Sequence, residues 1–140
     1  VPKKGKGMQF LSGNFPPLLD LLKSAYRSFT SGAFPECEES MQTIITSIPL
    51  IQATSRAEST DIKEMVDICR EYITAVRVNT AMKEMSGDAA RQLELACYRT
   101  HCQLQSSHLT LVLNSAMTTA YKAKVSTTTI PSRAIIYHAC

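Results

Sequence analysis

The stretch SGAFPECEESMQTIITSIP, residues 31–49, decides the fold class of this 140-residue chain. Its apolar residues recur at intervals of three and four, the spacing of one face of an α-helix: Met41, Ile44, Ile45 and Ile48. Proline suits the first turn of a helix and cannot continue one, so Pro35 marks the expected start and Pro49 the expected end. The stretch therefore predicts a helix rather than a catalytic loop.

Another helix is predicted directly before it, in the run NFPPLLDLLKSAYRSF, residues 14–29. Its apolar residues follow the same spacing: Leu18, Leu22, Ala25 and Phe29. Gly32 is the expected stop, because glycine readily takes the left-handed conformation that ends many helices. A link this short leaves the two helices room only for antiparallel packing.

A long third helix is predicted from Ser55 onward. Ser55 followed by Glu58 is the capping-box pattern of a helix N-terminus. The face expected to turn inward consists of Ile62, Met65, Val66, Cys69, Tyr72, Ile73 and Val76. The opposite face is charged, as in an amphipathic helix. The helix is expected to continue until the SGD sequence at residues 86–88 ends it.

Two more helices are predicted after it. Asp88 is the expected N-cap of a fourth helix that runs to Cys102. Its inward residues are Leu93, Ala96, Cys97 and Thr100. A fifth helix is expected to begin at Ser106 or Ser107, with these residues on its inner side: Leu109, Val112, Leu113, Ala116, Met117 and Ala120. The residues from Val125 onward fit a short helix, a strand or no regular structure.

The predicted fold class is all-α, with antiparallel helix pairs stacked as a short tetratricopeptide-like α-solenoid fragment. No segment with a period of two residues is long enough to build a sheet. In tetratricopeptide-type repeats a small residue at the turn precedes an aromatic residue, a second small residue and a closing proline. Gly32, Phe34, Cys37 and Pro49 follow that order. With Tyr72 on the third helix, they are the predicted repeat-packing residues.

Composition and charge exclude several classes of protein. The chain has 15 Lys and Arg against 12 Asp and Glu, and three of the cations lie near the N-terminus, so we expect no basic face for nucleic acid. No run approaches the ~20 apolar residues that span a bilayer. Five cysteines without framework spacing favour buried thiols in the cytosol. The expected domains are a flexible basic leader at residues 1–14, a helical-repeat domain at 15–124 and a divergent tail at 125–140.

Two blocks in the second half of the chain are more specific than the repeat pattern. The first is CREYI at residues 69–73, and the second runs from ACYRTHCQLQSSHLTLVLNSAM at residues 96–117 to YKAK at residues 121–124. The positions that carry the second block are Ala96, Tyr98, Thr100, His101, Leu104, Gln105, His108, Leu111, Val112, Leu113, Ala116, Lys122 and Lys124. Over residues 26–124 the chain resembles the C-terminal region of the coatomer alpha-subunit family.

The resemblance implies a structural, non-enzymatic role in the COPI vesicle coat, in transport between Golgi and endoplasmic reticulum. It implies a cytoplasmic location, peripheral on Golgi and coated-vesicle membranes, with the membrane contacted only through the coat. The implied partners are the coatomer epsilon subunit and other coat subunits. After Lys124 the chain departs from the family, which continues with an alanine-rich helix bearing paired arginines and then a Cys-rich, partly β segment; here the sequence is STTTIPSRAIIYHAC with Val125 before it.

Four residues raise the question of chemistry: Cys97, His101, Cys102 and His108. Cys97 and His101 are one helical turn apart, as zinc ligands can be. However, Cys102 points about 100° away from His101 on an ideal helix, and no Cys-x-x-Cys pair is present. A nucleophilic cysteine needs a lowered thiol pKa and an orienting group, and the pattern indicates neither. We therefore expect no metal, cofactor or catalytic residue.

Two interpretations stay open for the turn between the fourth and fifth helices. His101, Gln105 and His108 either cap helix ends or form part of a surface that binds a partner. Arg70 belongs either to a solvated face or to such a surface. These four are the candidate partner-binding residues.

Two alternative functions remain beside the coat role. One is a tetratricopeptide-type adaptor that binds an extended peptide, although only one repeat is recognisable and no ladder of groove-lining Asn, Lys and Arg is visible. The other is a small α-helical enzyme or metal protein, which would show bound metal or one unusually reactive thiol.

Overall fold

The structure, a computed structural model, describes residues 15–126 of the chain. Its elements are α1 (Phe15–Ser31), α2 (Phe34–Ser47), the 3-10 turn η1 (Ile48–Leu50), α3 (Arg56–Glu84), α4 (Ala89–Thr100) and α5 (Ser106–Ser126). No β-strand occurs within this range, so the all-α prediction is confirmed. The predicted leader, and the predicted tail beyond its first two residues, lie outside the described residues.

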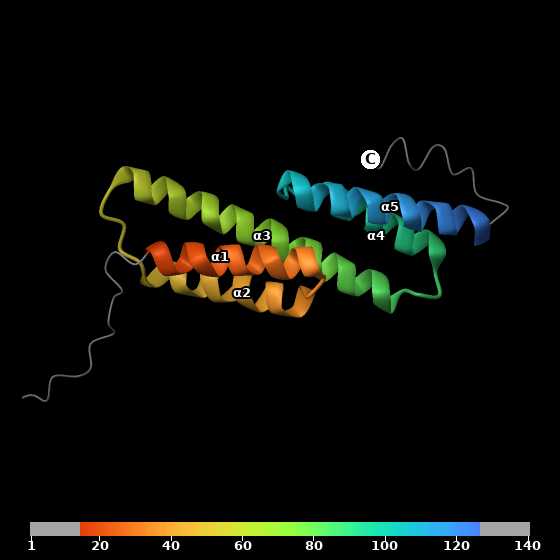
Figure 1. Ribbon diagram of the computed structural model, residues 1–140, viewed down its shortest axis with the longest axis horizontal. Coiled ribbons are helices and arrows are strands. Elements are labelled where there is room, and N and C mark those ends of the chain that lie inside the picture. Colours follow the sequence, from red (N-terminus) through yellow and green to blue (C-terminus); the bar gives the residue numbers. More distant parts are fainter. Residues whose placement is uncertain (1–14, 127–140) are drawn as a thin grey trace, which may run out of the picture.

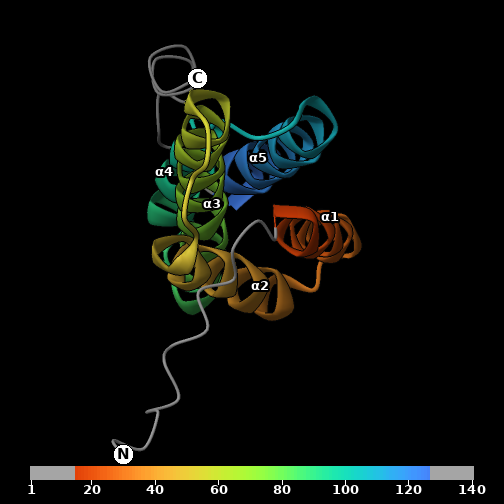
Figure 2. The ribbon, with the colours of Figure 1, turned by 90° about the vertical axis from the view of Figure 1, so that its left-hand side faces the viewer.

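Each helix packs against the next one along the chain. Contacts join α1 to α2, α2 to α3, α3 to α4 and α4 to α5. The longest helix, α3, has 29 residues and extends along the molecule, with α1 and α2 beside one part of it and α4 and α5 beside another (Figure 1). Viewed from the end, α1 and α5 lie on the same side of α3 (Figure 2). Stacking of such pairs into a solenoid stays a prediction.

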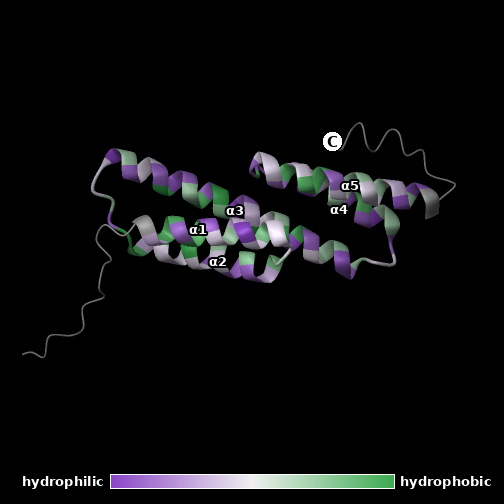
Figure 3. Ribbon diagram, viewed as in Figure 1, coloured by the Kyte–Doolittle hydropathy of each residue, from purple (hydrophilic) through white to green (hydrophobic). Residues whose placement is uncertain are grey.

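The main core lies where α1, α2 and α3 meet. Residues with at most 1% of their surface exposed come from all three helices: Ala25, Cys37, Met41, Ile44, Cys69, Tyr72, Ala75 and Val76. Burial of each larger apolar side chain stabilises the fold by about 1.5–3 kcal/mol. Apolar and polar bands alternate along the helices, as amphipathic packing requires (Figure 3). Of the face predicted for α3, Ile62, Val66 and Ile73 are only partly buried.

The ends of α3 and α4 follow the expected capping chemistry. The Ser55 hydroxyl accepts a hydrogen bond from the Glu58 N–H at 3.1 Å, and the Asp88 carboxylate accepts one from the Arg91 N–H at 3.0 Å. The Glu58 carboxylate accepts bonds from the hydroxyl and the N–H of Thr54 at 2.6 and 2.7 Å, one residue before the cap. The Thr54 hydroxyl bond is the main cause that lowers the pKa of Glu58.

The inner side of α5 differs from the prediction. Val112 and Ala116 are buried as expected, but Leu113 is 40% and Met117 70% exposed, so their inward assignment is wrong. The buried face of α5 instead includes His108. Apolar residues cover more than one side of this helix, so their spacing alone does not select the face that packs. Contact with α4, and bonds from His108 to other helices, select it.

Gly32 forms the turn between α1 and α2. Its φ is +80°, and the N–H groups of Gly32 and Ala33 donate to carbonyls in the last turn of α1 at 3.2 and 2.9 Å. An added Cβ would meet no atom within 4 Å. The cost of a side chain here is therefore confined to the left-handed backbone, which L-residues disfavour by about 1–2 kcal/mol.

Gly32→Ala is accordingly expected to lower the free energy of unfolding by about 1–2 kcal/mol, measured by urea denaturation. Gly87→Ala is the matched control, because a Cβ at Gly87 also meets no atom within 4 Å and its φ is not positive. Its expected change is within about 0.5 kcal/mol. Equal losses in the two variants would contradict the backbone explanation.

Candidate functional site

His108, at the start of α5, joins three helices. Its Nδ1 lies 2.6 Å from the Tyr72 hydroxyl of α3, and its Nε2 lies 2.8 Å from the Thr30 hydroxyl of α1. The Gln105 N–H donates to the same Tyr72 oxygen at 3.1 Å. Only 3% of His108 and 1% of Tyr72 are exposed. This cluster fixes the beginning of α5 against α1 and α3.

One protonation state of His108 satisfies every group in the cluster. The Tyr72 oxygen accepts from Gln105, so its own hydrogen is free to donate to His108 Nδ1. The Thr30 hydroxyl donates to the Tyr26 carbonyl at 3.0 Å, so its oxygen accepts from Nε2–H of His108. The arrangement therefore matches a neutral imidazole with its proton on Nε2. Burial lowers the pKa of His108 from its ordinary value of 6.5, with a smaller opposing effect from the Tyr26 backbone.

The lowered pKa of His108 predicts that stability depends on pH. Because the unfolded chain binds a proton more readily at His108, stability is full above the ordinary pKa and falls as the pH drops below it. We expect the urea midpoint to be lower at about pH 5.5 than at about pH 7.5. His108→Gln is expected to remove most of this difference. His101→Gln, at an exposed position, is expected to keep it, and an unchanged slope in His108→Gln would refute the assignment.

The other candidate partner-binding residues are exposed. His101 is the C-cap of α4, and its N–H donates to the Tyr98 carbonyl at 3.1 Å. Arg70 pairs with Asp67 at 3.2 Å, with both side chains well exposed. Arg70 is two residues from Tyr72, so about 200° of helix separates it from the His108 cluster. The structure thus brings Gln105 and His108 together through Tyr72, and it places Arg70 on another face. Partner binding by these residues stays a prediction.

The residues predicted to pack the repeat lie at the junction of α1, α2 and α3. Phe34 meets Phe29 edge to face, with ring centroids 5.4 Å apart. Cys37 is fully buried, and Pro49 lies in η1 directly after α2. Burial, as the main cause, raises the pKa of Cys37 and that of Cys69 to about 11. Both are therefore protonated at neutral pH and are weak nucleophiles.

Residues 15–126 contain no cluster of three or more His, Cys, Asp and Glu side chains that could hold a metal ion. Within the same range, every helix is too short or too polar to cross a membrane.

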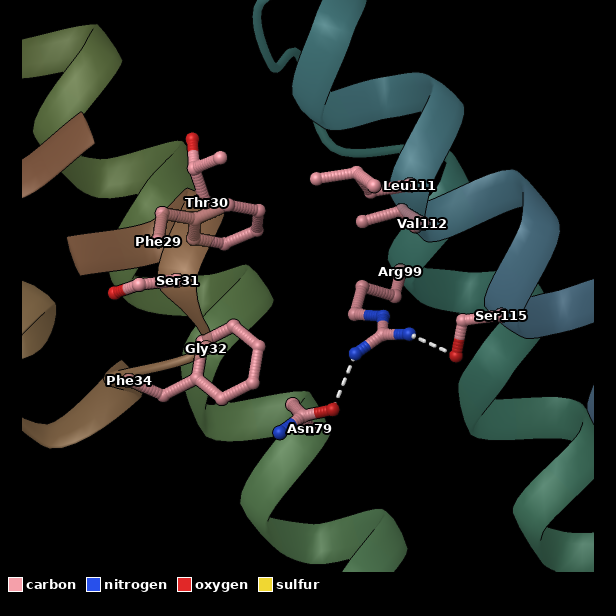
Figure 4. A pocket seen from close by; sticks show the side chains of 10 residues that line it. All are labelled: Phe29, Thr30, Ser31, Gly32, Phe34, Asn79, Arg99, Leu111, Val112 and Ser115. Carbon is pink, nitrogen blue, oxygen red and sulfur yellow. Dashed lines mark hydrogen bonds between the residues drawn. The ribbon is translucent and has the colours of Figure 1, made fainter. Parts of the chain in front are cut away.

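A cavity of about 280 Å³ opens between the α1–α2 turn and α5, and residues of all five helices line it. Phe29 and Phe34 lie on one side, and Leu111 and Val112 on the other (Figure 4). Arg99 reaches into the space between them from α4. Arg99 and its neighbour Asn79 were not among the residues predicted from the sequence. A signal existed, because Arg99 lies three residues after Ala96 on the predicted inner face of α4.

A second surface feature is an apolar stripe on α5, formed by Leu113, Met117 and Tyr121. These residues recur every four positions, so they share one side of the helix. They are 40%, 70% and 72% exposed. Met and Tyr are enriched in protein–protein interfaces. The stripe is therefore a candidate contact surface.

Helix packing, a lined cavity and an exposed apolar stripe define a class: an all-α domain that carries two candidate contact surfaces. The family described as the C-terminus of the coatomer (COPI) alpha subunit matches residues 3–133, and the chain belongs to this family. The resemblance inferred from CREYI and the block at residues 96–124 is thereby confirmed.

Curated relatives agree with the family match. Coatomer subunit alpha-2 and coatomer subunit alpha-1 of Oryza sativa subsp. japonica are each 44% identical over 119 residues, 85% of this chain and 10% of the relative. Coatomer subunit alpha-1 of Arabidopsis thaliana is 41% identical over 111 residues, 79% of this chain and 9% of the relative. Coatomer subunit alpha of Dictyostelium discoideum is 40% identical over 114 residues, which are 76% of this chain and 9% of the relative. The chain spans about a tenth of the length of these relatives.

Proposed function

We propose that this chain is a non-enzymatic structural segment of the COPI vesicle coat, a helical scaffold for coat-subunit assembly in Golgi–ER transport. The observation that carries the proposal is the match of residues 3–133 to the coatomer alpha-subunit family. The proposed partners are the coatomer epsilon subunit and other coat subunits. The proposed location is cytoplasmic, peripheral on Golgi and COPI-coated vesicle membranes, with the membrane contacted only through the coat.

The proposed mechanism is geometric, because no bond is made or broken. A few apolar and aromatic side chains that fill pockets of the partner supply most of the affinity in such interfaces. The apolar stripe Leu113, Met117 and Tyr121 supports this mechanism, since these side chains lie on one exposed side of a helix that packs firmly on α4. The raised thiol pKa values of Cys37 and Cys69 favour a scaffold over a cysteine enzyme.

The test is co-elution of the 140-residue chain with a purified coatomer epsilon subunit on a sizing column. A complex is the expected result, and separate peaks would contradict docking of that subunit. Met117→Asp with Tyr121→Asp is expected to weaken the complex at least about tenfold. Lys63→Asp, at an exposed position on α3, is the control and is expected to bind like the parent. Arg70→Ala, His101→Ala and Gln105→Ala test the candidate partner-binding residues in the same assay.

A second candidate function is a tetratricopeptide-type adaptor that binds an extended peptide. The observation that favours it is the cavity between the α1–α2 turn and α5, because peptide grooves are lined by side chains of several helices. The adaptor predicts that a short peptide occupies this cavity, whereas docking through the stripe on α5 leaves it open.

A further inference from the structure

Arg99 is a buried cation that has no negatively charged partner within residues 15–126. Only 4% of the residue is exposed. One terminal nitrogen donates to the Asn79 side-chain oxygen, and the other donates to the Ser115 hydroxyl at 2.8 Å (Figure 4). Both acceptors are neutral, and the buried Nε has no hydrogen-bond partner. None of the ion pairs formed within residues 15–126 includes Arg99.

This arrangement is unfavourable for the isolated chain. A buried charge costs free energy unless an opposite charge and enough hydrogen bonds compensate it, and arginine is almost never fully buried without a partner. Burial accordingly lowers the pKa of Arg99 from its ordinary value. Glu71 and Arg99 both influence the pKa of the Cys102 thiol. The Glu71 carboxylate accepts a hydrogen bond from the Gln103 N–H at 3.1 Å, and no ion pair joins it to Arg99 within residues 15–126.

The surroundings of Arg99 suit a carboxylate carried by a side chain. The cavity of about 280 Å³ is at the small end of ligand sites, where one side chain fits. Its aromatic and aliphatic side chains lie beside the guanidinium, and an apolar neighbourhood of this kind strengthens a charge-assisted hydrogen bond. Among the described residues that line the cavity, Arg99 is the only charged one, which matches a single negative charge better than a phosphate. A guanidinium can hold a carboxylate through two parallel bonds.

Within residues 15–126, no acidic side chain forms an ion pair with Arg99. The printed residues 1–14 and 127–140 contain no Asp or Glu. Within the described part, the acids that form ion pairs do so with Lys23, Arg70, Arg77 and Arg91.

We propose that this cavity is a recognition site for the acidic side chain of an Asp or Glu in an extended segment of a partner protein, with Arg99 as its anchor and apolar neighbours of the acid packed on Phe29, Phe34 and Leu111. The inference deepens the adaptor function and rests on it. It does not depend on docking of the epsilon subunit.

The test follows the Nε–Hε resonance of Arg99 by nuclear magnetic resonance in the 140-residue chain. The probe is the blocked tripeptide acetyl-Leu-Glu-Leu-amide, and its neutral isostere acetyl-Leu-Gln-Leu-amide is the control. We expect a saturable shift with the Glu peptide and an affinity about tenfold or more lower for the Gln peptide. Equal affinities, or no saturable shift with either peptide, would overturn the proposal.

Two further probes separate other sources of the anion. One is acetyl-Leu-Leu with a free terminal carboxylate, and the other is inorganic phosphate. Both are expected to bind more weakly than the Glu peptide. Tighter binding of either one would overturn the assignment to an acidic side chain.

Variants separate recognition from folding. Arg99→Met combined with Asn79→Leu removes both partners of a buried polar pair, so the expected Tm is unchanged or higher. Binding of the Glu peptide, followed by calorimetry, is expected to be lost, while co-elution with the epsilon subunit is retained. Arg99→Lys, which keeps the charge without the two-pronged geometry, is expected to weaken binding. Arg91→Met on the exposed side of α4 is the matched control. Parent-like peptide binding by the double variant would refute the site.

Discussion

Replacement of Tyr72 by alanine is expected to lower the free energy of unfolding by about 3–5 kcal/mol, the range for large aromatic side chains in a core. Tyr72 is 1% exposed. The centroid of its ring lies 5.1 Å from the ring centroid of Tyr26 and 5.2 Å from that of Phe29. Its hydroxyl also bonds His108 and the N–H of Gln105. One truncation therefore leaves a cavity and removes the connection between α3 and the start of α5.

Tyr72→Phe separates the contribution of the hydroxyl from that of the ring, and Tyr98→Ala is the control. Tyr72→Phe keeps the ring but leaves Nδ1 of His108 and the Gln105 N–H without their partner, so we expect a loss of about 1–3 kcal/mol. Tyr98→Ala, at a position 68% exposed, is expected to change stability by at most about 0.5 kcal/mol. Urea denaturation followed by circular dichroism measures all three. A loss in Tyr98→Ala as large as that in Tyr72→Ala would disprove the assignment of the core.

The second large effect is expected at Cys37, where α2 packs on its neighbours. Cys37 and Cys69 are both fully buried in the cluster that joins α1, α2 and α3. Cys37→Leu inserts extra volume into this contact, and we expect a loss of about 1–3 kcal/mol through overpacking. The smaller Cys37→Ala is expected to cost less. This order of the two variants would support the predicted role of Cys37 as a small residue that lets helices approach closely.

The control for Cys37 lies on the exposed side of the same helix. Thr43→Leu adds a similar side chain where no neighbouring helix has to move, so its expected change is within about 0.5 kcal/mol. Denaturation midpoints compare the variants. If Cys37→Leu were as well tolerated as Thr43→Leu, close packing at Cys37 would be refuted.

The candidate site was only partly predictable. The apolar repeats of α1, α2 and α3 identified most of the core, because most apolar residues of those helices lie on the side that packs. The same reasoning failed on α5, where apolar residues lie on several sides and Leu113 and Met117 are exposed. Arg99 and Asn79 were missed because polar residues are expected at the surface, and only a neighbouring helix can make their burial tolerable.

The sequence by itself determined the helices, their ends and the family. The helices and their ends depend on contacts within a turn or two, such as the Ser55 and Asp88 caps and the left-handed Gly32. The family follows from the order of residues in the two blocks at 69–73 and 96–124. Tertiary structure alone decided which side of α5 turns inward and what surrounds Arg99. The reason is the distance along the chain: the bond between Thr30 and His108 joins residues 78 positions apart, and that between Tyr72 and His108 joins residues 36 apart. No local pattern encodes such pairs, so packing between helices selects them.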